Sequence, residues 1–158
     1  MTPIHVSRRK FLSAASKFGA ALAVLPLLRP FAAFAATERN TAAFSAKSMS
    51  DVIKAYGGAD AKESTEITIT APEIAENGAV VPVTVESKIA GTRTISVLVE
   101  KNPAALSARF EIPEGTDAYA ATRVKVGETS NLIAVVQTAD GTFYAQKPVK
   151  VTLGGCGG

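Results

Sequence analysis

Histidine, cysteine and tryptophan are scarce in this chain, and their scarcity excludes several kinds of chemistry. The 158 residues contain one histidine, one cysteine and no tryptophan. A single cysteine cannot build a disulfide framework or a thiolate zinc site. The histidine, His5, lies near the start, so residues 36–158 cannot supply a Ser-His-Asp triad, a Cys-His pair or a histidine metal site. We therefore expect no cofactor and no metal.

Acidic residues are missing from the first 35 positions, which hold five of the chain's 17 lysine and arginine residues. The other 12 basic residues stand against 14 aspartates and glutamates, so the first segment accounts for the whole formal charge of +3. The rest of the chain therefore offers no basic surface to attract nucleic acid, and we expect no nucleic-acid partner.

The first 35 residues have the pattern of an export signal. Arg8 and Arg9 stand in the sequence Ser-Arg-Arg-Lys-Phe-Leu, which resembles a twin-arginine signal; an ordinary secretory signal is the alternative. The apolar stretch that follows is interrupted by Pro26 and Arg29, well short of the roughly 20 apolar residues that span a membrane. We predict a twin-arginine signal peptide over residues 1–35, cleaved after Ala35, and a periplasmic mature protein without a membrane anchor.

Residues 36–158 are rich in β-branched side chains and poor in leucine. Valine, isoleucine and threonine occupy 35 of these positions against four leucines, a bias that favours strands. From residue 65 onward apolar and polar residues alternate, and turn residues separate the runs. The predicted strands span residues 65–71, 80–87, 92–101, 105–112, 118–126, 131–138 and 142–153. This pattern predicts an all-β domain over residues 36–153, an immunoglobulin-like antiparallel β-sandwich of about seven strands.

One short helix is predicted before the strands. Ser48 and Asp51 have the spacing of a capping box, and Gly57-Gly58 ends the pattern. The apolar stripe between them, which we interpret as core packing, consists of Met49, Val52, Ile53 and Tyr56. Further along, Asp140-Gly141 between two strand-like runs predicts a two-residue hairpin loop.

The prolines suggest where the sheets have edges. Pro82 and Pro148 cannot donate to a strand ladder, so we expect their strands to be edges or bulged there. The run 92–100 has no proline and places Leu98 on the face opposite its other apolar residues. Two interpretations stay open: a central strand whose second face is covered by a loop, or an exposed surface for a partner subunit.

Two carboxylate pairs, Glu73 with Glu76 and Glu111 with Glu114, have the residue type needed for acid–base catalysis. Both pairs lie beside turn prolines in polar loops, where carboxylates are ordinarily solvated. We therefore expect no catalytic residue and a protein that is not itself an enzyme.

Residues 154–158 read Gly-Gly-Cys-Gly-Gly and predict a flexible arm. Gly154, Gly155, Gly157 and Gly158 leave the backbone unrestricted around Cys156, whose thiol reaches roughly 10 Å from Leu153 at about 3.3–3.6 Å per residue. No basic residue adjoins the cysteine to activate its thiolate, which favours a covalent carrier that partner enzymes act upon. The alternative is a non-catalytic periplasmic interaction module whose terminal cysteine forms an intermolecular disulfide.

Together, the signal, the strand-rich domain and the pentapeptide around Cys156 resemble the SoxY family, sulfur carriers of the bacterial thiosulfate-oxidising (Sox) system. Residues 121–131 and 149–153 also resemble that family. The resemblance implies that a haem enzyme joins thiosulfate oxidatively to Cys156, that a hydrolase releases sulfate, and that a sulfane dehydrogenase, where present, oxidises the remaining sulfur. It also implies a heterodimer with a smaller β-rich subunit, SoxZ, exported together with the signal-bearing chain.

Overall fold

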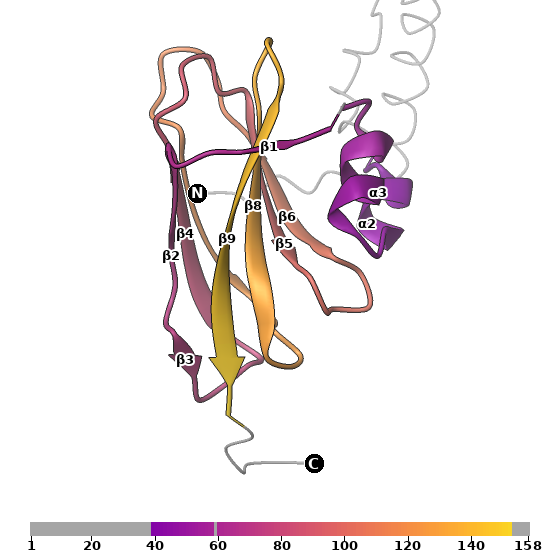
Figure 1. Ribbon diagram of the computed structural model, residues 1–158, viewed down its shortest axis with the longest axis vertical. Coiled ribbons are helices and arrows are strands. Elements are labelled where there is room, and N and C mark those ends of the chain that lie inside the picture. Colours follow the sequence, from indigo (N-terminus) through magenta and orange to yellow (C-terminus); the bar gives the residue numbers. More distant parts are fainter. Residues whose placement is uncertain (1–38, 59, 153–158) are drawn as a thin grey trace, which may run out of the picture. The chain divides into compact units, whose positions relative to one another are not determined.

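The computed structural model describes residues 39–58 and 60–152, which form two facing β-sheets and two short helices (Figure 1). The helices are α2 (Thr41–Ser45) and α3 (Met49–Ala55). The strands are β1 (Lys62–Glu63), β2 (Ile67–Thr70), β3 (Ile74–Ala75), β4 (Val81–Ser87), β5 (Thr94–Val99), β6 (Leu106–Glu111), β7 (Tyr119–Val124), β8 (Ser130–Gln137) and β9 (Thr142–Val151).

The larger sheet has the strand order β1-β9-β8-β5-β6, with β3 also pairing with β9, and the smaller sheet has the order β2-β4-β7. The long strands pair antiparallel, whereas β1 and β3 run parallel to β9. This arrangement confirms the all-β, immunoglobulin-like sandwich, and each of the seven predicted strands is present. The prediction missed β1 and β3 because two residues are too few to show an alternating pattern.

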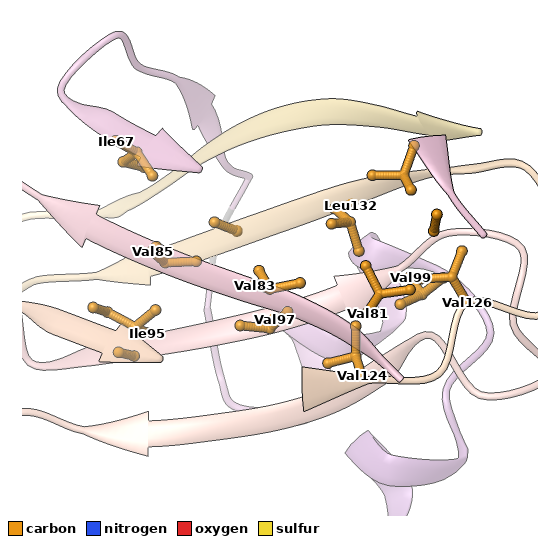
Figure 2. Close-up of a cluster of buried hydrophobic side chains, with 14 of the residues drawn as sticks. Ile67, Val81, Val83, Val85, Ile95, Val97, Val99, Val124, Val126 and Leu132 are labelled. Atoms are coloured by element: carbon orange, nitrogen blue, oxygen red, sulfur yellow. The ribbon is translucent and has the colours of Figure 1, made fainter. Parts of the chain in front are cut away.

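The main core fills the space between the two sheets (Figure 2). The alternate residues of β4 and β5 that line it are Val81, Val83, Val85, Ile95, Val97 and Val99. Burying one such side chain is worth about 1.5–3 kcal/mol relative to leaving it exposed. The apolar side chains at every second residue of these strands therefore hold the two sheets together.

A second apolar cluster lies on the outer face of the larger sheet, where α2 and α3 pack. Leu98 is fully buried there, on a strand that lies between β8 and β6. The run 92–100 is thus a central strand, covered by helices rather than by a loop, and its interpretation as an exposed partner surface is wrong. The buried members of this cluster are Ala43, Ala46, Val52, Ile53, Leu98, Ala105, Leu106, Ile133 and Val135.

The predicted helix α3 has the expected caps. The Ser48 hydroxyl accepts a hydrogen bond from the amide of Asp51 at 3.2 Å. At the other end Gly57 has a φ of +69°, and the amide of Gly58 donates to the carbonyl of Ile53 at 2.9 Å. The prediction of a single helix is wrong, because α2 precedes it. With five residues, only one of them buried, α2 is too short to show an apolar stripe.

Pro82 and Pro148 each lie where a strand has a neighbour on one side only. β4 is the central strand of the smaller sheet, but β2 pairs only with its residues 84–87, so Pro82 pairs with β7 alone. On the outer edge of β9, β1 meets residues 143–144 and β3 meets residues 150–151, and Pro148 lies in the gap between them. At Pro82 and at Pro148, the predicted edge is confirmed, because each strand has one open side at that residue. Along the rest of their length, β4 and β9 have neighbours on both sides.

The hairpin between β8 and β9 is present, but the predicted Asp140-Gly141 loop is wrong. The amide of Thr138 donates to the carbonyl of Gly141 at 3.0 Å, which makes Ala139 and Asp140 the central residues. The Thr138 hydroxyl also accepts hydrogen bonds from the amides of Asp140 and Gly141. Gly141 does not have a positive φ. It therefore does not occupy the turn position at which an Asp-Gly hairpin loop requires glycine.

Candidate functional site

The residues predicted to carry function lie outside the described part of the chain. They are Arg8 and Arg9 of the export signal, Gly154, Gly155, Gly157 and Gly158 of the arm, and Cys156. The structure does describe the point from which residues 153–158 continue. We call residues 149–152, the end of β9 and the residue after it, the arm root.

The arm root is paired along both edges of β9. On one side Val149 pairs with Ser130 of β8. On the other side β3 lies parallel, and the amide of Lys150 donates to the carbonyl of Glu73 at 2.9 Å. The amide of Thr152 then donates to the carbonyl of Ala75 at 3.2 Å. The main chain is therefore held in the sheet up to the last described residue.

A side chain takes the place of β8 just before that strand begins. The amide of Val151 donates to the hydroxyl of Thr129 at 3.0 Å, one residue before β8 begins. Thr129 lies within the segment 121–131, so part of that segment fastens the arm root. Each such bond contributes about 0.5–1.5 kcal/mol net. Three successive amides of the arm root thus have protein acceptors.

Gly78 allows the turn before β4 to lie against the arm root. A Cβ atom on Gly78 would overlap the backbone oxygen of Val126 and lie 2.9 Å from Cγ1 of Val151. The amide of Val126 donates to the carbonyl of Gly78 at 2.7 Å, and Asn77 Oδ1 accepts from the amide of Ala79 at 2.9 Å. Any side chain at position 78 would therefore push these segments apart.

At this end of the sandwich, the Asn102 side chain links the β5–β6 loop to the β7–β8 loop by hydrogen bonds. Its Nδ2 donates to the carbonyl of Lys125 at 2.7 Å, and its Oδ1 accepts from the amide of Gly127 at 3.1 Å. Nearby, Asn131 Nδ2 donates to Glu100 Oε2 at 2.9 Å. Sequence reasoning missed Gly78, Asn102 and Thr129, because each acts on a residue distant in the sequence.

The carboxylates considered above for acid–base catalysis lie on the surface. Glu73, Glu76, Glu111 and Glu114 are all exposed, as expected for solvated carboxylates. Within residues 39–58 and 60–152 no group of three or more His, Cys, Asp and Glu side chains could hold a metal ion. No helix in the described ranges is long and apolar enough to cross a membrane.

The one clear pKa shift among the described groups lies away from the arm root. Burial lowers the pKa of Arg109, and the nearby Tyr56 and Glu111 partly oppose that effect. The guanidinium stacks 3.8 Å from the centroid of the Tyr56 ring and donates to Ser96 Oγ and Gln137 Oε1 at 3.2 and 3.0 Å. We interpret Arg109 as the residue that fastens the end of α3 to the larger sheet.

The fold and the arm root define a class of protein: a β-sandwich domain whose last strand is fastened on both edges just before a cysteine-bearing segment. The family described as sulfur oxidation protein SoxY matches residues 53–156, a range that includes all nine strands and Cys156. This chain belongs to the SoxY family. Its role is therefore that of a sulfur carrier in sulfur oxidation.

A solved structure of a family member agrees with this assignment. The sulfur carrier protein SoxY from Chlorobium limicola f thiosulfatophilum is 38% identical, with a TM-score of 0.60, over 66% of this chain and 94% of its own. A superoxide reductase (neelaredoxin) from Ignicoccus hospitalis is 21% identical over 54% of this chain and 79% of its own. Its TM-score is 0.48. No curated protein sequence matches the chain.

Proposed function

We propose that this protein holds thiosulfate-derived sulfur covalently on Cys156 and presents it to the enzymes of the Sox system in the periplasm. The observation that carries the proposal is the position of the single cysteine, four residues beyond an arm root in which the amides of Lys150, Val151 and Thr152 all have acceptors. Family membership supplies the kind of cargo, which is sulfur on its way to oxidation.

The proposed cycle has an oxidative and a hydrolytic step. First, the Cys156 thiol and the sulfane sulfur of thiosulfate form a disulfide-type bond, giving R–S–S–SO₃⁻, where R is the carrier. Two electrons pass to a haem enzyme, and the one proton of the thiol passes to solvent. A hydrolase then adds water across the terminal S–S bond, which releases hydrogen sulfate and leaves R–S–SH on the carrier. A sulfane dehydrogenase, where present, oxidises this remaining sulfur.

The geometry at the arm root supports presentation rather than catalysis. Cys156 follows Thr152 by four residues, so the cysteine stays within about 14 Å of the domain at about 3.3–3.6 Å per residue. Glycine neighbours add no side chains that would clash with the walls of a narrow active site. The redox centre and the proton-transfer groups then belong to the partner enzymes.

Two further parts of the proposal concern location and assembly. The twin-arginine-like segment around Arg8 and Arg9 supports export to the periplasm as a folded protein. We also propose a heterodimer with a smaller, SoxZ-like β-rich subunit that leaves the cytoplasm together with this chain. Co-expression should give a 1:1 complex on size-exclusion chromatography, and a soluble monomer that ignores the co-expressed partner would contradict the heterodimer. An intact Met1 on the periplasmic protein would contradict the export signal.

The carrier proposal is tested by replacing Cys156→Ser in the mature chain. Sulfate production by the reconstituted Sox enzymes should be abolished, because the attachment atom is lost, while the melting temperature should not change. Intact-mass spectra of wild-type protein from cells fed thiosulfate should show adducts of sulfur, sulfite or thiosulfate on Cys156. Undiminished sulfate production by the variant, or a cysteine found only as free thiol or dimer disulfide, would favour the interaction module instead.

A further inference from the structure

A cleft lies between the end of α3 and the outer face of the larger sheet, at the hairpin that joins β8 and β9. Its volume is about 400 Å³, within the range of about 300–1,000 Å³ that small-molecule sites have. Among the described residues that line it, Arg93 and Arg109 are basic and Asp140 is acidic, so the two positive charges exceed the negative one. The charge of the lining therefore favours an anion.

The floor of this cleft is polar, although the same face of the sheet is apolar where α2 and α3 cover it. Thr94, Gln137 and Thr142 pair directly across β5, β8 and β9, so their side chains share one face. Further along β5 and β8 that face carries Leu98 and Ile133, which belong to the second apolar cluster. Both threonines are buried. Because core packing alone would favour apolar side chains in such places, the polar row points to a polar ligand.

The Arg109 guanidinium beside this row is held in a fixed orientation by neutral groups. The ring of Tyr56 covers one face, and Ser96 Oγ and Gln137 Oε1 each accept a hydrogen bond from it. Gln137 Oε1 also accepts from the hydroxyl of Thr94 at 3.3 Å, which fixes the amide in turn. A guanidinium has five N–H donors, and these two hydrogen bonds use two of them. The group is therefore oriented before any ligand binds.

The charge of Arg109 is only partly balanced by its neighbours. The side chains that accept its two hydrogen bonds are neutral, and the carboxylate that acts on it, Glu111, is exposed to solvent. Burial therefore lowers the pKa of Arg109 despite the opposing effects of Tyr56 and Glu111. Arg93 lines the same cleft as a second cation. An anion beside both guanidiniums would offset this charge, with a stronger attraction than in bulk water.

We propose that Arg93 and Arg109 bind a small inorganic oxyanion of the sulfate type in this cleft. Guanidinium groups hold oxyanions through paired, charge-assisted N–H···O hydrogen bonds. Apart from Tyr56, the described lining side chains are polar or no larger than alanine. The cleft therefore has little apolar surface for the carbon skeleton of an organic acid, and this favours an inorganic anion.

This anion site is separate from the attachment point at Cys156. The cleft lies at Thr142, the first residue of β9, and the arm root lies at the other end of that strand. The 10 residues of β9 span about 30 Å at about 3.3 Å per residue, whereas Cys156 stays within about 14 Å of Thr152. The site therefore lies beyond the reach of the thiol, and it does not depend on the carrier function proposed above.

Titration of the ¹⁵N-labelled mature chain, followed by NMR, tests the site. Sodium sulfate, sodium thiosulfate or sodium acetate is added at constant ionic strength, with sodium chloride as the balancing salt. We expect saturable shifts of the Gly57, Gly58 and Gly141 amide signals with sulfate or thiosulfate, and binding of acetate at least about tenfold weaker. The exposed Arg93 is replaced by Arg93→Gln, which should weaken sulfate binding about tenfold, the effect of losing one charge-assisted hydrogen bond.

Lys125→Gln is the matched control, because it removes the same charge from an exposed residue at the other end of the sandwich, where Asn102 binds the Lys125 carbonyl. It should leave the affinity for sulfate unchanged. Arg109→Lys keeps the charge but loses the paired donors, so it should also weaken binding about tenfold. If that variant melts early, Arg93→Gln decides alone.

Three results would overturn the anion site: no saturable shift with sulfate or thiosulfate, equal affinity for acetate, or an equal loss of affinity in Lys125→Gln. None of them bears on the carrier function, because sulfate production by Cys156→Ser is a separate measurement. The site and the carrier function can therefore fail independently.

Discussion

Replacing Gly78→Ala tests whether close packing at the arm root stabilises the domain. The added Cβ would overlap the backbone oxygen of Val126 and lie 2.9 Å from Cγ1 of Val151. The valine side chain can rotate, but the backbone oxygen can move only with the β7–β8 loop. That movement strains the 2.7 Å hydrogen bond from the amide of Val126 to the carbonyl of Gly78.

Overpacking of this kind costs about 1–3 kcal/mol of unfolding free energy. For a domain of this size, the loss corresponds to a fall in melting temperature of about 4–12 °C. Circular dichroism during a thermal scan of the mature chain measures it. Gly141→Ala is the control, because its nearest contacts would be ring atoms of Phe143 at 3.9 and 4.0 Å. We expect that variant to be neutral or to gain about 0.4–1 kcal/mol. A Gly78→Ala variant that melts within a degree of wild type would refute the argument.

Two other substitutions probe the second core and the arm root. Leu98→Ala removes a fully buried side chain between β5 and the helices and should cost about 2–5 kcal/mol in urea denaturation. A cost below about 1 kcal/mol would mean that α2 and α3 do not pack as described. Thr129→Val removes the acceptor for the amide of Val151 and should cost about 1 kcal/mol and speed hydrogen exchange at that amide. Thr129→Ser keeps the hydroxyl and should restore slow exchange, whereas equal exchange in both variants would contradict this role.

Local signals in the sequence were sufficient for most of the fold. The capping pair Ser48 and Asp51 predicted the start of α3, because a cap depends on residues only three positions apart. The alternating pattern of β4 and β5 predicted strands, because one face of each strand meets the apolar core. Such signals lie within a single element, so they can be read without knowing what the element packs against.

Features that depend on distant residues could not be predicted in the same way. Pro148 is tolerated because β1 and β3 leave a gap on the edge of β9, and both of those strands come from residues 62–75. The second face of Leu98 is covered by α2 and α3, more than 40 residues away in the sequence. Thr129 and Gly78 matter only because β9 returns beside them. No pattern within their own segments identifies that neighbour.

A firmly held arm root is consistent with a short carrier segment. The local concentration of a tethered group falls as its tether lengthens, and short tethers give values in the millimolar range. If Lys150, Val151 and Thr152 left the sheet, the tether to Cys156 would gain three residues, or about 10 Å of reach at about 3.3–3.6 Å per residue. The carbonyls of Glu73 and Ala75 and the hydroxyl of Thr129 oppose this loss through three hydrogen bonds. Under the proposed function, these bonds keep the thiol at a high local concentration close to the end of β9.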